Sequence, residues 1–181
     1  MEAVIQPSAI AAESESALPT FSQALEVHKA MVYSILWHFL HDRALADELA
    51  QDIFFELHRS WNSLKSPAHL ASWLRRVTAH RAIDQVRKRK TRSETSLEET
   101  AEPTVFERVH DGFLSYYLER MVASLPPQQR MLLILRYQED MEWQEIADVL
   151  DMKVSTAKTQ AARALELLRA KTSHRLRPGD A

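Results

Sequence analysis

The histidine, acidic and basic side chains are the residues of this sequence that could do chemistry, and their spacing points away from catalysis. The chain has no cysteine, which excludes a disulfide framework, a thiolate zinc site and a cysteine nucleophile. His38 and His41 could share one helix face, but no acidic residue accompanies them in a metal-site spacing. There is also no phosphate-binding glycine loop and no nucleophile motif. We therefore predict that the protein is not an enzyme and needs no metal or cofactor.

Basic residues concentrate in one segment, which is the first candidate for nucleic-acid binding. The segment carries Arg75, Arg76, Arg81, Arg87, Lys88, Arg89, Lys90 and Arg92, with Trp73 and His80 interleaved. A cationic track with planar side chains provides phosphate contacts and base stacking. The simpler alternative is a solvated basic end on a core helix. Because the net charge of the whole chain is only −2, the basic character is local and not a general coat.

The second candidate is a helix-turn-helix near the end of the sequence. Residues 143–150 are expected to form a short amphipathic helix, followed by a turn at 151–153 and a longer helix. Ile146, Leu150 and Met152 would fill the space between the two helices. The outer face of the longer helix would present Ser155, Thr156, Lys158, Thr159, Gln160 and Arg163. These side chains suit the major groove of DNA, although a solvated helical hairpin is the alternative.

Helices must position both candidates, because apolar residues recur every three and four positions and the chain has only 2 glycines. The first helix is expected over 22–40. Asp42 is expected to cap the second helix, and Ser66 followed by Pro67 would open the third, which carries the basic run. The three helices share an apolar interior and predict a first domain at 21–90.

Composition changes sharply after the basic run. Residues 91–112 are rich in glutamate and contain Pro103, which predicts a flexible acidic linker. Residues 113–171 return to a helical pattern and form the expected second domain. Residues 1–20 read as a flexible leader with no signal peptide or membrane anchor, and 172–181 as a short tail. The predicted fold is therefore all-α, with two small helical domains joined by the linker.

Four segments in order resemble motifs of the extracytoplasmic-function (ECF) group of bacterial RNA polymerase sigma factors. The first is Ala46-Asp47-Glu48-Leu49-Ala50-Gln51-Asp52-Ile53-Phe54, and the second is Trp73-Leu74-Arg75-Arg76-Val77-Thr78-Ala79-His80 with Asp84-Gln85-Val86-Arg87. The third is Leu125-Pro126-Pro127-Gln128-Gln129-Arg130, and the fourth is Glu145-Ile146-Ala147. Together they are much more specific than any one of them.

The resemblance implies a role for each candidate surface. It makes residues 21–90 a three-helix region 2 domain and residues 113–171 a region 4 helix-turn-helix domain. The polymerase would be bound by Glu48, Gln51 and Asp52. The single-stranded −10 element would be read by Trp73, Arg76, His80, Arg81, Arg87 and Lys88, and the duplex −35 element by Ser155, Thr156, Lys158, Thr159, Gln160 and Arg163. The acidic linker resembles the segment that threads toward the polymerase active centre.

Three positions depart from the family pattern, and they bear on base preference. His80 stands where asparagine is common, Asp151 where glycine is common, and Gln160 where arginine is frequent. The implied partners are core RNA polymerase, promoter DNA and, in many members, an anti-sigma factor. The implied location is the cytoplasm, without membrane insertion.

Two other classes of protein remain as alternatives. An ordinary helix-turn-helix regulator would bind duplex DNA by itself. A sigma-mimicking antagonist of an anti-sigma factor would lack DNA-facing charges and carry a receiver domain, whereas the basic run at 87–92 is present here.

Overall fold

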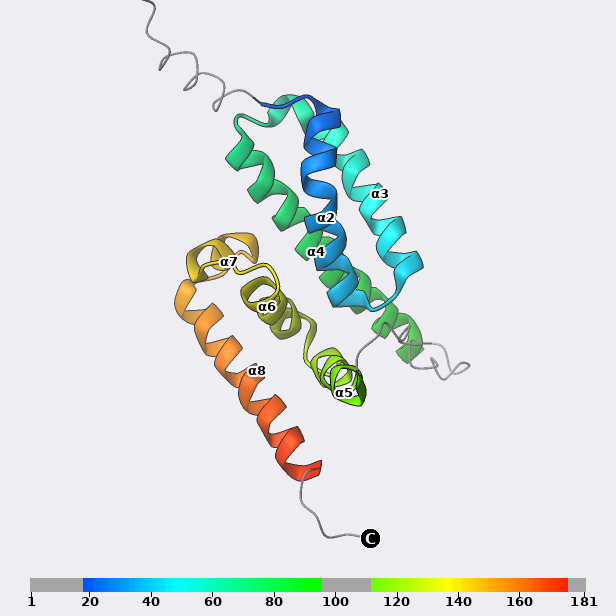
Figure 1. Cartoon of the computed structure of the whole chain (residues 1–181), viewed down its shortest axis with the longest axis vertical. Coiled ribbons are helices and arrows are strands. Elements are labelled where there is room, and N and C mark those ends of the chain that lie inside the picture. Colours follow the sequence, from blue (N-terminus) through cyan, green and yellow to red (C-terminus); the bar gives the residue numbers. More distant parts are fainter. Residues whose placement is uncertain (1–17, 96–111, 176–181) are drawn as a thin grey trace, which may run out of the picture.

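The computed structural model describes residues 18–95 and 112–175 (Figure 1). These residues form helices and no strand, which confirms the predicted all-α class. The elements are α2 (Phe21–Leu40), α3 (Arg43–Ser60), the 3-10 turn η1 (Trp61–Ser63), α4 (Pro67–Thr95), α5 (Gly112–Ala123), α6 (Pro127–Tyr137), α7 (Trp143–Val149) and α8 (Val154–Arg175). Most of the expected leader, linker and tail lies outside the described residues.

The first helical unit, α2 to α4, begins and turns where local side chains dictate. Thr20 caps α2 by accepting a hydrogen bond from the Gln23 backbone N–H at 3.3 Å, while the Gln23 side chain accepts one from the Thr20 N–H at 2.9 Å. His41 ends α2 in the left-handed conformation, with φ of 51°. Asp42 then accepts a hydrogen bond from the Leu45 N–H at 3.0 Å, which confirms the predicted cap of α3.

Helix α4 starts as the sequence predicts and ends later. Ser66 accepts a hydrogen bond from the His69 N–H at 3.2 Å, and Pro67 occupies the first turn. The basic residues near its end are good helix formers and no glycine or proline interrupts them, so the helix continues past Lys90 to Thr95. The fully buried Phe39, Ile53 and Leu74 lie on the facing sides of α2, α3 and α4.

The second helical unit, α5 to α8, is built around the helix-turn-helix. Helix α5 ends at Ala123, and α6 begins at Pro127. Helices α7 and α8 are joined by a turn in which the Met152 N–H donates to the Ala147 carbonyl at 3.0 Å. Asp151 takes a positive φ of 58° there, a conformation that aspartate tolerates better than most residues other than glycine.

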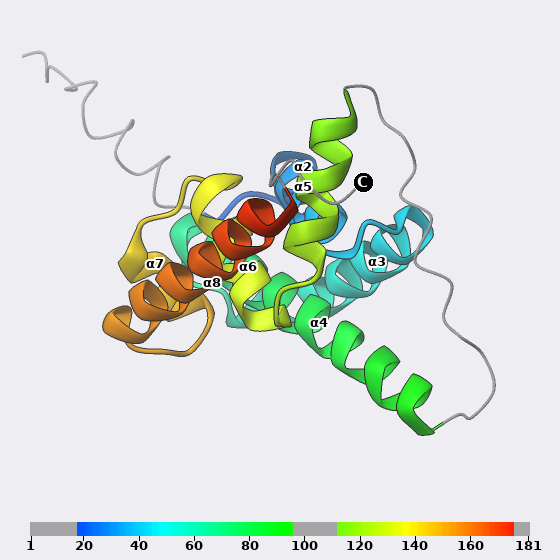
Figure 2. The same ribbon diagram turned by 90° about the horizontal axis from the view of Figure 1, so that it is seen from below.

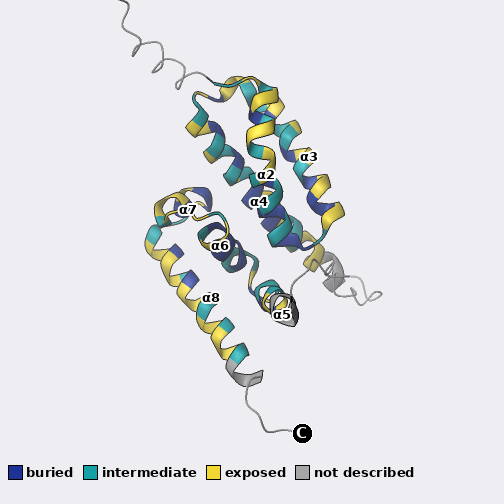
Figure 3. Ribbon diagram, in the orientation of Figure 1, coloured by how far each residue is buried: buried dark blue, intermediate teal, exposed yellow. Residues whose placement is uncertain are grey.

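The two helical units pack against each other. Helix α6 contacts both α2 and α4, and α7 contacts α4 (Figures 1 and 2). One continuous cluster of buried side chains includes Ile35 and Leu74 of the first unit together with Leu132, Leu135 and Ile146 of the second. Buried residues accordingly line the facing sides of α2, α4 and α6 in Figure 3, while the outer side of α8 is exposed.

Candidate nucleic-acid interface

The six side chains predicted to read a −10 element all lie on α4, but they occupy two faces of it. At about 100° per residue, Trp73, Arg76, His80 and Arg87 fall within roughly 60° of one another, and Arg81 and Lys88 lie about 100° further round the helix. Arg76, Arg81, Arg87 and Lys88 are exposed, whereas Trp73 and His80 are half-buried.

The face of α4 that carries Arg76 and His80 contacts the second helical unit. The Arg76 guanidinium forms an ion pair with the Asp151 carboxylate at 2.7 Å, and the His80 Nε2 lies 3.0 Å from the Val149 carbonyl oxygen. Because a carbonyl oxygen only accepts, Nε2 of His80 carries the proton that is donated. Two residues predicted to bind DNA are therefore engaged by the end of α7 and the turn that follows it.

The second face of α4 lies beside α3. Arg81 is paired with Glu56, and this hydrogen bond raises the pKa of the Arg81 guanidinium above its ordinary value. Arg89 forms an ion pair with Asp42 at 3.2 Å and so ties the basic end of α4 to the cap of α3. The pairs leave both guanidinium groups about half exposed, so each contributes little stability.

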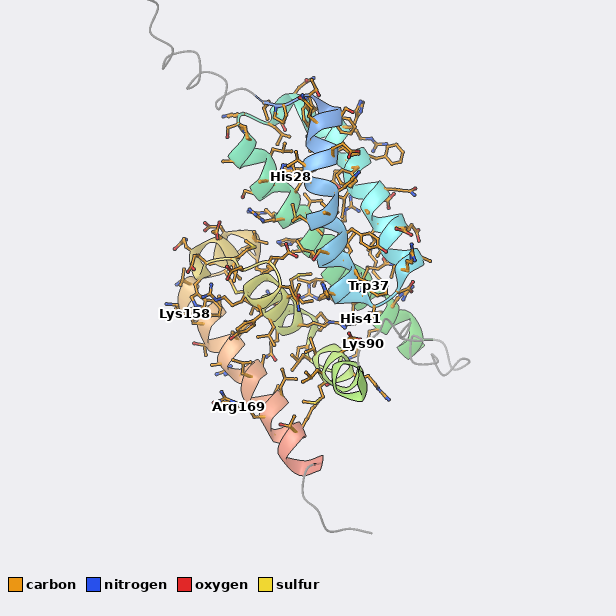
Figure 4. The ribbon with its side chains drawn as sticks, in the orientation of Figure 1. His28, Trp37, His41, Lys90, Lys158 and Arg169 are labelled. Atoms are coloured by element: carbon orange, nitrogen blue, oxygen red, sulfur yellow. The ribbon has the colours of Figure 1, made fainter. Side chains whose placement is uncertain are left out.

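The predicted −35 surface lies on α8 and faces away from the protein. Ser155, Thr156, Lys158, Thr159 and Arg163 are exposed and Gln160 is half-buried. Ala157, Ala161 and Ala164 occupy the opposite side and are buried, so the small side chains allow α8 to pack closely. Lys158 extends outward from the first half of α8 in Figure 4.

The predicted polymerase-binding residues lie together on α3. Glu48, Gln51 and Asp52 are all exposed. Gln51 also borders an open groove lined by the apolar side chains of Phe21, Leu25, Phe54 and Phe55 together with His58. The surface thus combines carboxylates with exposed apolar area; the Phe55 side chain alone is 67% exposed. Such a combination suits a protein partner with a basic and apolar face.

A buried polar cluster lies where α6 meets the end of α2. The Arg130 guanidinium stacks on the Phe39 ring, 4.4 Å from its centroid, and burial lowers the pKa of Arg130 to about 10. Burial, helped by the charge of Arg130 and by His38, lowers the pKa of His41 to about 4. Ser34 donates a hydrogen bond to Glu139 at 2.7 Å beside the same contact.

Two further features were sought among the described residues, a metal-ligand cluster and a membrane-spanning helix. These residues contain no group of three or more histidine, cysteine, aspartate or glutamate side chains that could hold a metal ion. None of their helices combines the length and apolar character needed to cross a bilayer.

Comparison with known proteins assigns both helical units to one family. The model of sigma-70 region 2 matches residues 25–92, and the model of sigma-70 region 4 matches residues 115–168. The chain belongs to the sigma-70 family. Region 2 therefore corresponds to α2 to α4, and region 4 to α5 to α8.

Full-length relatives and solved structures agree with this assignment. The chain is 27% identical to the ECF sigma factor SigE of Mycolicibacterium smegmatis over 161 residues, which cover 86% of the chain and 62% of SigE. It is 25% identical to the ECF sigma factor SigW of Bacillus subtilis, covering 82% of the chain and 87% of SigW. These relatives identify the chain as a sigma factor of the ECF group.

Two solved sigma factors share the fold. RpoE in complex with the anti-sigma factor NepR from Bartonella quintana aligns with a TM-score of 0.66 and 18% identity, covering 84% of this chain and 96% of RpoE. CnrH in complex with the cytosolic domain of CnrY aligns with a TM-score of 0.63 and 19% identity, covering 92% of this chain and 96% of CnrH.

Sequence reasoning missed the groups that contact the region 2 side chains predicted to bind DNA. Asp151 and the Val149 carbonyl engage Arg76 and His80, and Glu56 engages Arg81. Glu56 follows Asp52 by one helical turn, so helix periodicity alone places it beside the predicted acidic surface. No local signal connects Asp151 with Arg76, because 75 positions separate them.

Proposed function

We propose that this sigma factor binds core RNA polymerase through α3 and recognises promoters with α4 and α8. Region 2, at 21–90, supplies polymerase binding and the −10 contacts, and region 4, at 113–171, supplies the −35 contacts. The main supporting observation is that the chain has two exposed cationic helices and matches the models of sigma-70 region 2 and region 4 in that order.

The chemistry of each helix fits a different nucleic-acid form. The end of α4 has six basic side chains and a single acidic one between 81 and 92, and Trp73 adds a planar ring near its start. Cations and planar rings together bind unstacked single strands. Helix α8 is the second helix of the helix-turn-helix and presents lysine, glutamine and arginine side chains, which suit base edges in a major groove.

We further propose that the protein acts in the cytoplasm, without catalysis of its own, and that an anti-sigma factor is a candidate regulator. The support for this regulator is the shared fold with RpoE and CnrH, whose structures contain NepR and the cytosolic domain of CnrY. The sigma-mimicking alternative is disfavoured because the cationic residues Arg81, Arg87 and Lys88 are all present and exposed.

Run-off transcription tests the central proposal. Core polymerase is incubated with and without the chain on a library of genomic promoters, and new transcripts should start only when the chain is present. Failure to associate with core polymerase, under conditions in which another sigma factor associates, would show that the proposed function is wrong. Tight duplex binding by the chain alone, without transcription, would instead support the ordinary regulator.

The proposed polymerase-binding surface on α3 has its own test. Glu48→Lys combined with Asp52→Lys should weaken holoenzyme formation about tenfold or more, because a face complementary to a basic partner becomes repulsive. Asp148→Lys reverses an exposed carboxylate on α7, outside the proposed polymerase-binding surface, and should change affinity much less. Equal affinity for the double variant and the parent would remove Glu48 and Asp52 from the interface.

A further inference from the structure

We propose that the apolar groove between α2 and α3 is the docking site of the chain's own residues 1–17, which precede the described part of the chain. Ile5 and Ile10 are the side chains that enter it. The groove is lined by Phe21 and Leu25 of α2 and by Gln51, Phe54, Phe55 and His58 of α3. Because Gln51 belongs to the proposed polymerase-binding surface, the docked segment competes with the polymerase, a consequence that rests on the proposed function.

The groove is an apolar surface that the described helices leave uncovered. It has a volume of about 440 Å³, and the Phe55 side chain at its edge is 67% exposed. Helix α3 packs mainly against α2, α4 and η1, and it lies on the side of the molecule away from α7 and α8 (Figures 1 and 2). Removing such apolar area from water is favourable, so the groove favours an occupant with aliphatic side chains.

The chain enters α2 at one end of this groove. Leu18 is half-buried and packs against the core, and the capping box of Thr20 fixes the start of α2. Phe21 lines the groove directly after this cap, and its ring packs edge-on against the rings of His58 and Trp61, with centroids 5.1 and 5.5 Å away. The residues that precede Leu18 are therefore attached beside the groove.

The length of the segment suits the groove. Between Gln51 and His58 the groove follows about two turns of α3, or roughly 10 Å. The eight residues from Ile10 to Leu18 can span up to about 27 Å, and Ile5 reaches further. Because the segment is covalently attached at the end of the groove, its effective concentration there is on the order of millimolar. This attachment favours the segment over a second copy of the chain.

The charges of the segment also match the end of the groove where it is attached. Residues 1–17 contain three glutamates and no lysine or arginine, and two of the glutamates, Glu13 and Glu15, lie close before the start of α2. Arg59 and Lys65 follow the α3 end of the groove, are exposed and form no ion pair with any described residue. Opposite charges at this end favour docking of the segment, and salt should weaken the attraction.

Photo-cross-linking of the full chain tests the occupancy directly. Phe55 is replaced by p-benzoylphenylalanine, which keeps an aromatic ring at the exposed edge of the groove, and the free protein is irradiated. Mass spectrometry should find cross-links from position 55 to residues 4–12 of the same chain. Val27, replaced in the same way, is the matched control, because it is 70% exposed on α2 and is not among the residues that line the groove. It should give little cross-linking to the segment.

Substitutions in the segment identify the side chains that enter the groove. Ile5→Ser with Ile10→Ser should reduce the cross-linked fraction at position 55 about fivefold or more, because both aliphatic side chains lose their gain from burial. Ser8→Ala with Ser14→Ala changes the same segment without removing an aliphatic side chain and should leave the cross-linked fraction unchanged. Far-ultraviolet circular dichroism checks that every variant is folded.

Competition with the polymerase has a separate measurement. Ile5→Ser with Ile10→Ser should tighten association of the full chain with core polymerase about two- to fivefold, because a larger fraction of the free protein then has an open groove. The serine-to-alanine control should bind core polymerase as the parent does.

The outcomes separate this inference from the proposed function. Cross-links that join two copies and increase with protein concentration would show that a second copy fills the groove, and a folded protein without cross-links to residues 4–12 would show that the segment does not. Either result would overturn the docking. Equal polymerase affinity in the double-serine variant and the parent would overturn the competition. If no variant associates with core polymerase, the proposed function fails, whereas the cross-linking result still decides the docking.

Discussion

Helices α4 and α8 both carry cations that the proposed function directs toward DNA, but they differ in what those cations contact within the protein. On α4, Arg76 and Arg81 are paired with Asp151 and Glu56. On α8, Lys158 and Arg163 are exposed and form no ion pair with any described residue. Two helices with similar basic residues can therefore differ in whether those residues are paired within the protein or free of such pairs. The fold decides this, because it determines which carboxylates lie beside each helix.

The largest expected effect concerns the buried polar cluster where α6 meets the end of α2, which we expect to make the protein acid-sensitive. His41 has a pKa of about 4 in the folded protein and an ordinary value of 6.5, so it binds fewer protons than the unfolded chain between these values. The contribution of His41 to the free energy of unfolding is therefore fully present above pH 6.5. As the pH drops, the free energy of unfolding falls, by about 2–3 kcal/mol at pH 4.

His41→Asn is the variant that checks this pH dependence. Asparagine tolerates the positive φ of this position and does not titrate, so the slope of stability against pH should decrease between pH 6.5 and 4. Urea unfolding at several pH values measures the slope. Some slope should remain, because burial and Arg75 also lower the pKa of His28. An unchanged slope would show that His41 does not control acid stability.

The next effect tests base reading on the exposed helix. Gln160→Ala should change the preferred −35 sequence and cost roughly 1–3 kcal/mol on the native site if the amide binds one base through two hydrogen bonds. Arg163→Ala should weaken binding to all sequences similarly and reduce the salt dependence by about one ion, because it lies one turn further along α8. Selection over randomised −35 elements with holoenzyme measures both; the reverse pattern would exchange the two roles.

A somewhat smaller effect concerns the turn between α7 and α8, which contacts α4 through Asp151. Asp151→Val should destabilise the protein by about 1–2 kcal/mol relative to Asp151→Gly, because a β-branched residue is strained at a φ of 58°. Both variants lack the carboxylate, so their difference isolates the backbone cost from the lost ion pair. Denaturant midpoints measure it. Equal midpoints would mean that the turn relaxes to another conformation.

The smallest effect concerns the other occupied cation. Glu56→Gln should release Arg81 from its ion pair and tighten binding of a single-stranded −10 oligonucleotide two- to threefold, which corresponds to roughly 0.5 kcal/mol for an exposed pair. Glu26→Gln removes the carboxylate of another exposed pair, with Lys29 on α2, and should leave the affinity unchanged. If both variants behave alike, Arg81 is already available to DNA and the contrast with α8 is limited to Arg76 and His80.

The sequence by itself determined the elements and their exposed faces. Short-range rules sufficed for this: Asp42 and Ser66 cap helices where predicted, and the predicted turn at 151–153 separates α7 from α8. Helical periodicity placed the predicted −35 side chains on the outer side of α8, with alanines opposite. These features depend on residues within a few positions of each other, which a single sequence contains in full.

Only the tertiary structure decided which polar side chains are paired across the two helical units. The residues in contact are 75 positions apart for Arg76 and Asp151, 69 for His80 and Val149, and 105 for Ser34 and Glu139. Local patterns carry no information about such pairs, because they arise when α6 and α7 bury apolar side chains against α2 and α4. Hydrophobic burial brings the two regions together, and the polar contacts follow from the register in which those faces meet.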